Sequence, residues 1–375
     1  METLFSANGL LFGTIVPFLF VLTVVVFVHE MGHYLIGRWC GIGVEAFSIG
    51  FGPELLGFND RTGTRWKLSA VPLGGYVKFV GDAGATSTPD AEHLSHLSPE
   101  QQAVAFHNQA TWKKAAAIFA GPAFNFLLTI AIFTVFFAFL GRPVLDPVVA
   151  SVMPDSAAEE AGFRPGDKFV AIDGTPVETF ADVQRLVAPH GGDVLRFEIE
   201  RDGERLVLEA TPRPMERDDG LGNKVTSGAI GVTNDRDTGR YRVEELGPLG
   251  AFTAAVRETG YLISNTFTFL KRLVAGREDK CNLGGPVKIA EMAGQAAQQG
   301  FQWLIQLTAL LSVGVGILNL MPVPPLDGGH LMFYAIESVT RRPVPEAVVE
   351  WVYRLGFLAV LTLMAFVFWN DLVAC

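Results

Sequence analysis

Four long runs of apolar residues divide the chain, and more polar stretches separate them. The runs cover about residues 10–36, 115–140, 303–320 and 352–368. Each approaches or exceeds the roughly 20 apolar residues that a helix needs to cross the hydrocarbon core of a bilayer. Pro17 lies inside the first run and predicts a kink there. The pattern therefore predicts a polytopic α-helical membrane protein with four transmembrane helices.

A fifth run, residues 251–274, is only moderately apolar. It contains Arg257 and Glu258 near its start and Lys271 and Arg272 near its end. Charges in these positions fit an amphipathic helix that lies at the membrane interface better than one that spans the bilayer.

The distribution of basic residues predicts the orientation of the four spans. The nine N-terminal residues and the tail after Phe368 contain neither Lys nor Arg. Basic residues occur in the connections 39–114 and 328–350, namely Arg61, Arg65, Lys67, Lys78, Lys113, Lys114, Arg341 and Arg342. Short loops rich in Lys and Arg remain in the cytoplasm. Both termini and the long region 141–300 are therefore expected outside the cytoplasm.

The first apolar run carries a His-Glu-x-x-His motif, from His29 to His33. Residues i and i+4 share one face of a helix, so His29 and His33 can bind one metal ion together. Glu30 is placed to act as a general base on water. At about 1.5 Å of rise per residue, Glu30 lies roughly 12 Å inside the charged end at Arg38. Ionisable groups at that depth are costly, which argues against a chance pattern or histidines satisfied within a helix bundle.

A third metal ligand is expected at Asp327, because a catalytic zinc ion usually has three protein ligands and a carboxylate commonly joins two histidines. Asp327 follows Pro322, Pro324 and Pro325, which break the helix ahead of it. A helix-ending Asp-Gly-Gly turn at the surface is the alternative. His330 is the competing ligand, but it lies beyond two glycines, and we expect it at a helix start or on the surface.

Between the first two spans, residues 44–52 and 65–71 alternate in polarity and are followed by Gly74, Gly75 and a short apolar strand. This pattern predicts a β-hairpin region near the membrane. We expect it to dip beside the metal motif, where an extended peptide could pair with its edge; an ordinary cytoplasmic hairpin remains the alternative. Residues 82–110 are predicted to form a polar loop.

Composition excludes several classes of protein. The chain has 375 residues, of which 49% are hydrophobic and 18% charged, so a sizeable soluble part accompanies the spans. A net charge of -10 argues against nucleic acid as a partner. Cys40, Cys281 and Cys375 are too scattered for a disulfide framework or a zinc cluster. The first run is too long for a secretory signal and lacks a basic start, so we expect it to be retained.

The outer region resembles a PDZ domain in the circularly permuted bacterial arrangement. The resemblance rests on a short Ala-rich helix closed by Gly162, a Pro-Gly-Asp turn at 165–167 and a strand ending at Asp173-Gly174. A helix at about 181–188 and strands at 194–201 and 204–210 follow. The resemblance implies that Gly228, Ile230 and Gly231 line a groove for a peptide. A small β-rich spacer is the alternative.

The order of these motifs is similar to that of the site-2 proteases, in their bacterial RseP-like branch. The shared segments are the His-Glu-Met-Gly-His helix, residues 120–125, the PDZ unit, residues 282–289 and residues 319–328. The resemblance implies a zinc intramembrane protease in which His29, His33 and Asp327 bind Zn²⁺, Glu30 is the base and Asn319 assists at the scissile carbonyl. Longer members carry two PDZ domains, whereas this chain shows one.

The resemblance also implies the substrate and the location. The protein is expected in the bacterial inner membrane, where it cuts the transmembrane segment of single-span proteins, such as anti-sigma factors or signal-peptide remnants, after a site-1-type protease has cut outside. A catalytically inactive PDZ-containing membrane adaptor and a metal transporter are the alternatives. The intact Glu30 argues against the adaptor, and the lack of an internal repeat argues against the transporter.

The expected organisation is as follows: the first span with the zinc motif (1–38), a cytoplasmic β-hairpin region and polar loop (39–114), the second span (115–140), the PDZ domain (145–235), an interfacial amphipathic segment (236–300), the third span (301–328), a cytoplasmic loop (329–350) and the fourth span (351–372).

Overall fold

The computed structural model describes residues 11–82, 84, 96–218, 224–234, 241–274, 284–342 and 344–374. It divides into two compact units. One, the helical unit, comprises Met1–Thr134, Phe252–Thr268 and Leu283–Cys375, and the other, the β-rich unit, comprises Val135–Ala251 and Phe269–Asn282. Much of the polar loop expected at 82–110, and the first two residues of the 282–289 motif, lie outside the described residues.

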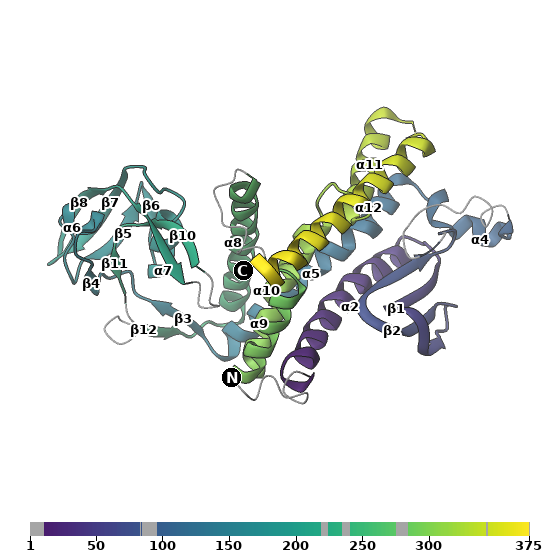
Figure 1. Cartoon of the computed structure of the whole chain (residues 1–375), viewed down its shortest axis with the longest axis horizontal. Coiled ribbons are helices and arrows are strands. Elements are labelled where there is room, and N and C mark those ends of the chain that lie inside the picture. The colour runs from purple at the N-terminus through teal and green to yellow at the C-terminus, as the bar shows by residue number, and fades with distance from the viewer. Residues whose placement is uncertain are drawn as a thin grey trace. The chain divides into compact units, whose positions relative to one another are not determined.

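Four helices of the described residues are long and apolar enough to cross a membrane, as the sequence predicts. These segments are Phe12–Trp39, Thr111–Phe139, Phe301–Asn319 and Ala347–Val373. They contain the α-helices α2 (Val16–Trp39), α5 (Thr111–Phe139), α10 (Phe301–Asn319) and α12 (Glu346–Trp369), labelled in Figure 1.

Pro17 lies near the junction of two helical segments. A π-helical turn, η1 (Leu11–Ile15), runs directly into α2, and Pro17 occupies the first turn of α2. The kink expected at Pro17 stays a prediction. Pro122 lies inside α5.

Shorter helices complete the helical unit. α9 (Pro286–Gln299) packs on α2 and α10 around a core of Val21, Val25, Ala293, Leu304 and Leu307. α11 (Asp327–Thr340) occupies part of the segment 329–350 that was expected as a loop. α4 (Pro99–Val104) and the 3₁₀ turn η2 (Phe106–Asn108) precede α5. α8 (Pro248–Val274) covers the moderately apolar fifth run and is not among the four candidate spans.

Two long bent strands, β1 (Val44–Asn59) and β2 (Arg65–Phe79), form the sheet of the helical unit. Residues 44–51 of β1 pair with 75–79 on one side and with 65–71 on the other, while 54–59 pair with 65–69. The two strands therefore make a four-segment sheet, ordered 54–59, 65–71, 44–51, 75–79, in which the two outer pairs run antiparallel and the central pair, 44–51 with 65–71, runs parallel. This order leaves the segment 75–79 as an edge.

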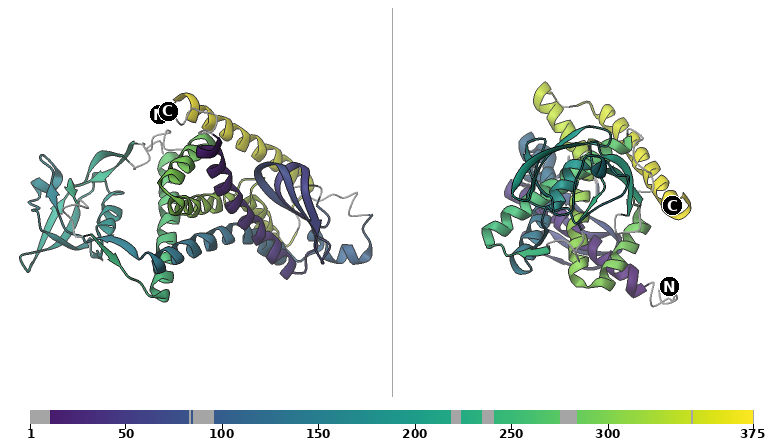
Figure 2. Two further views of the ribbon diagram at one scale, coloured as in Figure 1. Left: turned by 90° about the horizontal axis from the view of Figure 1, so that it is seen from below. Right: turned by 90° about the vertical axis from the view of Figure 1, so that its left-hand side faces the viewer.

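The edge segment lies against α2, and the two elements are neighbours in both Figure 1 and Figure 2. A Cβ atom added at Gly75 would lie 3.0 Å from Val26 Cγ1 and 3.2 Å from Glu30 Cγ. Because glycine has no Cβ atom, the backbone of the strand can approach α2 closely at Glu30, the residue next to His29.

Asp60, in the turn between β1 and β2, holds the sheet on α2. Its carboxylate accepts hydrogen bonds from Tyr34 Oη of α2 (3.0 Å), from Trp66 Nε1 (3.1 Å) and from the Thr62 and Thr64 N–H groups. Burial opposes ionisation of Asp60, but these donors outweigh it and hold the pKa of the carboxyl well below its usual range. The rings of Tyr34 and Trp66 also pack at 5.2 Å between centroids.

The β-rich unit is built on a four-stranded sheet, ordered β6-β5-β7-β8. Its strands are β5 (Lys168–Ile172), β6 (Thr175–Pro176), β7 (Leu195–Arg201) and β8 (Glu204–Ala210). Helices α6 (Ala157–Glu160) and α7 (Phe180–Val187) contribute to a core that includes Phe163, Phe169 and Phe197. Further antiparallel pairs join β3 (Arg142–Leu145) to β12 (Tyr241–Glu244), β4 (Ser151–Val152) to β11 (Val232–Thr233), and β9 (Arg213–Asp218) to β10 (Lys224–Ala229).

Candidate functional site

Two histidines of α2 and the first residue of α11 converge at one point of the helical unit. His29 Nε2 lies 3.2 Å from His33 Nε2, and Asp327 Oδ2 lies 3.1 Å from the former and 3.5 Å from the latter. Both histidines are buried. The sequence offered His29, His33 and Asp327 as a ligand set, and the structure brings them together although His29 and Asp327 are 298 positions apart.

The donor set fits a zinc ion. Ligand atoms bound at about 2.0–2.1 Å to a tetrahedral zinc ion lie about 3.3 Å from one another, close to the three separations found. Asp327 Oδ2 is buried and has no hydrogen-bond partner among the described residues. Two imidazole nitrogens and a carboxylate oxygen directed at one point supply lone pairs and no proton, so the arrangement lacks only a cation. His29, His33 and Asp327 could hold one metal ion together.

Helix α5 contacts the outer nitrogen of each histidine ring. His33 Nδ1 lies 2.9 Å from the carbonyl oxygen of Ala117, to which it donates when Nε2 carries the lone pair. His29 Nδ1 lies 3.2 Å from the side-chain amide of Asn125. Partners of this kind fix the tautomer and the orientation of metal-binding histidines.

Glycines allow α2 and α5 to cross at this point with their backbones in contact. A Cβ atom added at Gly32 would collide with the Ala120 carbonyl group, and one added at Gly121 would collide with His33 Nε2. Small residues are the usual means by which helices approach closely in a membrane. The same close approach brings the Ala117 carbonyl group within reach of His33 and the Asn125 side chain within reach of His29.

The convergence point opens into a cavity of about 160 Å³. Glu30 and Asn319, the last residue of α10, line it together with the three candidate ligands and the edge backbone of β2 at Gly75, Tyr76 and Val77. The remaining lining residues are Phe79, Ile118, Pro325 and His330.

His330 lies at a helix start, one of the two positions expected for it, because it belongs to the first turn of α11. It is not on the surface, since it is 7% exposed and lines the cavity. Its ring is 2.8 Å from Tyr353 Oη of α12. Gly356, one turn further along α12, allows that helix to contact the Pro324 carbonyl group. His330 is therefore buried by α12, and the residues near His330 in the sequence do not predict that this helix packs there.

A second polar pair lies where β2 leaves the site. Asp82 accepts a hydrogen bond from the Phe79 N–H at 3.2 Å, and His107 Nε2 lies 2.9 Å from its carboxylate. Burial raises the pKa of the Asp82 carboxyl, and the neighbouring His107 opposes that rise. The pair joins the end of β2 to η2, and neither residue lines the cavity.

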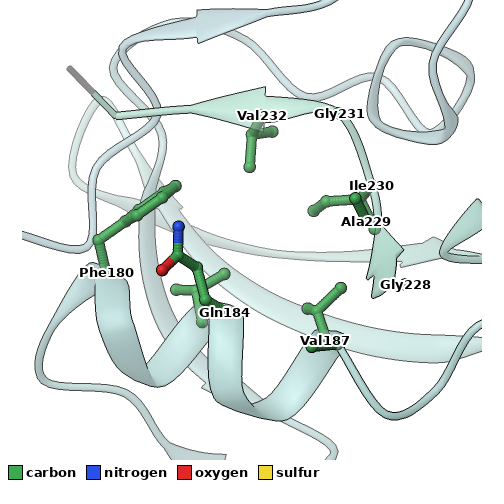
Figure 3. Close-up of a pocket in the computed structure, with 10 residues that line it drawn as sticks. Phe180, Gln184, Val187, Gly228, Ala229, Ile230, Gly231 and Val232 are labelled. Carbon is green, nitrogen blue, oxygen red and sulfur yellow. The ribbon is translucent and has the colours of Figure 1, made fainter. Parts of the chain in front are cut away.

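The other predicted site residues, Gly228, Ile230 and Gly231, lie in the β-rich unit. They line a groove whose opposite wall is helix α7, with Phe180, Gln184 and Val187 facing Ile230 and Val232 across it (Figure 3). Gly231 has a φ of 85°, a left-handed conformation that favours glycine. The groove is mostly apolar, and Gln184 is an exposed polar residue along it.

The model of peptidase family M50 matches residues 17–363. That range contains every residue of the cavity. The chain belongs to peptidase family M50, the site-2 proteases.

The similar proteins agree with this membership. A protein named a zinc metalloprotease in Mesorhizobium japonicum is 63% identical over 97% of this chain and 99% of its own length. A similarly named protein in Brucella suis is 62% identical over 99% of this chain and 98% of its own length. Metalloprotease MmpA of Caulobacter vibrioides is 37% identical over 96% of this chain and 95% of its own length. Among solved structures, a PDZ domain from Listeria monocytogenes matches 23% of this chain and 83% of its own, with 20% identity and a TM-score of 0.19.

The protein is therefore a zinc-dependent metalloendopeptidase of the membrane, as the sequence predicted. An inactive adaptor and a metal transporter, the two alternatives, do not agree with membership of this peptidase family.

The contact at Gly121 can be tested directly. We expect Gly121→Ala to weaken zinc binding about 10-fold or more, because the added methyl group collides with the nitrogen of His33 that faces Asp327. Zinc affinity is measured by competition with a chromophoric chelator. Gly314→Ala on α10 is the matched control, since a Cβ atom there meets nothing within 4 Å. Equal zinc affinity in the two variants would contradict the prediction.

Proposed function

We propose that this protein is an intramembrane endopeptidase that cuts the transmembrane segment of single-span proteins, with His29, His33 and Asp327 as zinc ligands. The observation that carries the proposal is the convergence of these three donor atoms in a cavity that also contains Glu30 and Asn319. Two of the ligands belong to a helix apolar enough to cross a bilayer. A hydrolytic centre at that depth serves substrates that are themselves in the membrane.

Each residue of the cavity has a distinct role. Zinc, when bound, supplies a Lewis acid that activates water and offsets the negative charge developing on the scissile carbonyl. Glu30 takes the proton of the attacking water and passes it to the leaving amine. Asn319 donates an amide hydrogen to the carbonyl oxygen of the substrate, where negative charge develops. Asn319 and Glu30 are supported in these roles by lining the same cavity as the ligands.

The edge of β2 holds the substrate in an extended form. A transmembrane helix satisfies its own backbone groups and cannot be cut until it unwinds locally. The backbone at 75–79 pairs with 44–51 on one side only, and its other side borders the cavity. An unwound substrate strand that pairs with this edge would recover hydrogen bonds beside Glu30.

We propose the location and the reaction order that the family resemblance implies. The protein lies in the bacterial inner membrane with both termini and residues 145–235 outside, which the Lys and Arg residues of the connections 39–114 and 328–350 support. His29 and His33 are then in the cytoplasmic third of the membrane. A site-1-type protease first removes the outer domain of the substrate, such as an anti-sigma factor or a signal-peptide remnant.

Residues 145–235 form a PDZ domain that selects substrates and takes no part in the chemistry. The support is the apolar groove between α7 and residues 228–232, which suits an added peptide strand (Figure 3). Gly228, Ile230 and Gly231 contribute one wall of that groove.

The general base is tested with Glu30→Gln. The three candidate ligands remain in this variant, so zinc should be retained in a 1:1 ratio. Loss of the base should slow cleavage of a model transmembrane peptide by about 10²–10⁴-fold. Metal analysis and cleavage are measured on the same purified sample. Cleavage at near the wild-type rate would show that Glu30 is not the base.

The ligand set is tested with Asp327→Ala and His330→Ala. Asp327 Oδ2 lies within 3.5 Å of both histidine Nε2 atoms, whereas the His330 ring contacts Tyr353. Asp327→Ala should therefore lose zinc and activity, and His330→Ala should keep zinc. The reverse pattern of metal content would overturn the assignment of the third ligand.

The groove is tested with Gln184→Trp, which places a large ring along it. Binding of a labelled peptide with a free apolar carboxyl end should weaken about 10-fold, while cleavage of a short, pre-trimmed substrate should not change. Ala181→Trp is the control, because Ala181 is exposed on α7 and does not line the groove. Equal peptide affinity in both variants would count against a peptide-binding role.

A further inference from the structure

Three buried polar residues lie where α5 meets α10 beside the metal site. Asn125 and Thr129 of α5 and Ser312 of α10 are all 0% exposed. Burying polar groups in apolar surroundings costs free energy unless they are hydrogen-bonded. Their partners therefore indicate what each residue contributes.

The hydroxyl groups join the two helices through backbone oxygens. Ser312 Oγ donates to the Asn125 carbonyl oxygen at 2.9 Å, and Thr129 Oγ1 donates to the Ala309 carbonyl oxygen at 2.9 Å. The first bond holds the backbone of Asn125 on α10, and the second joins the next turn of α5 to the same helix. They do not involve its side-chain amide, which extends away from α10 toward α2.

The side-chain amide of Asn125 contacts His29. The separation between Asn125 Nδ2 and His29 Nδ1 is 3.2 Å. Asn125 Oδ1 is buried and lacks a hydrogen-bond partner among the described residues. The oxygen and nitrogen of a side-chain amide exchange places when the group turns by half a rotation, and their assignment follows from their partners.

Zinc binding decides which amide atom faces the ring. A histidine that binds metal through Nε2 carries its proton on Nδ1, and that proton needs an acceptor. The amide nitrogen of Asn125 cannot accept it, whereas Oδ1 can. We propose that Asn125 is a positioning residue whose Oδ1 accepts the Nδ1–H of His29 and so fixes the ring for zinc; this inference rests on the proposed role of His29 as a ligand.

The same helix then orients both histidines. The Ala117 carbonyl oxygen receives the Nδ1–H of His33, and Asn125 Oδ1 receives that of His29. Ala117 and Asn125 are eight residues apart on α5, roughly two turns, and so lie on one face of that helix. The Ala117 backbone carbonyl group orients the His33 ring. The longer reach of the Asn125 side chain allows α5 to orient the His29 ring, which lies one turn away on α2.

The test compares zinc affinities of the full-length protein in detergent, measured by chelator competition. Asn125→Leu keeps the volume and removes the acceptor, and its zinc affinity should fall about 10–100-fold. Asn125→Asp keeps an acceptor and should bind zinc within a few-fold of wild type. Thr129→Val is the matched control, since it removes a buried hydroxyl on the same helix that does not contact His29, and it should leave the affinity unchanged. The absorption spectrum of the Co²⁺-substituted protein should change in Asn125→Leu and not in Thr129→Val.

The outcomes separate positioning from packing. Unchanged affinity in Asn125→Leu, or equal losses in Asn125→Leu, Asn125→Asp and Thr129→Val, would overturn the inference. His29→Ala in the same assay tests the site itself. If His29→Ala loses zinc while Asn125→Leu keeps it, the proposed site stands and the positioning role fails; if His29→Ala keeps zinc at full affinity, both fail.

Discussion

Three electron-pair donors that meet inside an apolar helix bundle repel one another unless a cation lies among them. His29 Nε2, His33 Nε2 and Asp327 Oδ2 occupy such a position, with separations of 3.1–3.5 Å. An uncompensated carboxylate at this depth is expensive, so a cation bound among these atoms would stabilise the fold as well as supply chemistry. The glycine contacts of α5 and the edge of β2 lie around this same point.

The parts of the site that could be predicted depend on short-range rules. The spacing of His29 and His33 follows from the period of a helix, and their placement in a spanning segment follows from the apolar residues around them. Asp327 was proposed because two histidines leave a catalytic zinc ion one protein ligand short, and because the motif around it resembles that of the site-2 proteases. The four spans were found for the same reason, since length and hydropathy are properties of each segment alone.

The parts that could not be predicted depend on which helices cross. Asn125 is 96 residues from His29, and nothing in its neighbours along the chain indicates that its amide meets an imidazole. His330 lies at a helix start, as one of its two expected positions, but its burial was not predicted because its partner Tyr353 belongs to α12.

The backbone contact between Gly32 of α2 and Ala120 of α5 has a consequence for the enzyme in different lipids. Helices respond to a thicker or thinner bilayer mainly by changing their tilt. Two helices whose backbones touch at one point turn about that point, so displacement grows with distance from it. The histidine rings lie beside this pivot, whereas the far ends of the helices lie many turns away. The positions of the two histidine rings are therefore the part of α2 that is least sensitive to membrane thickness.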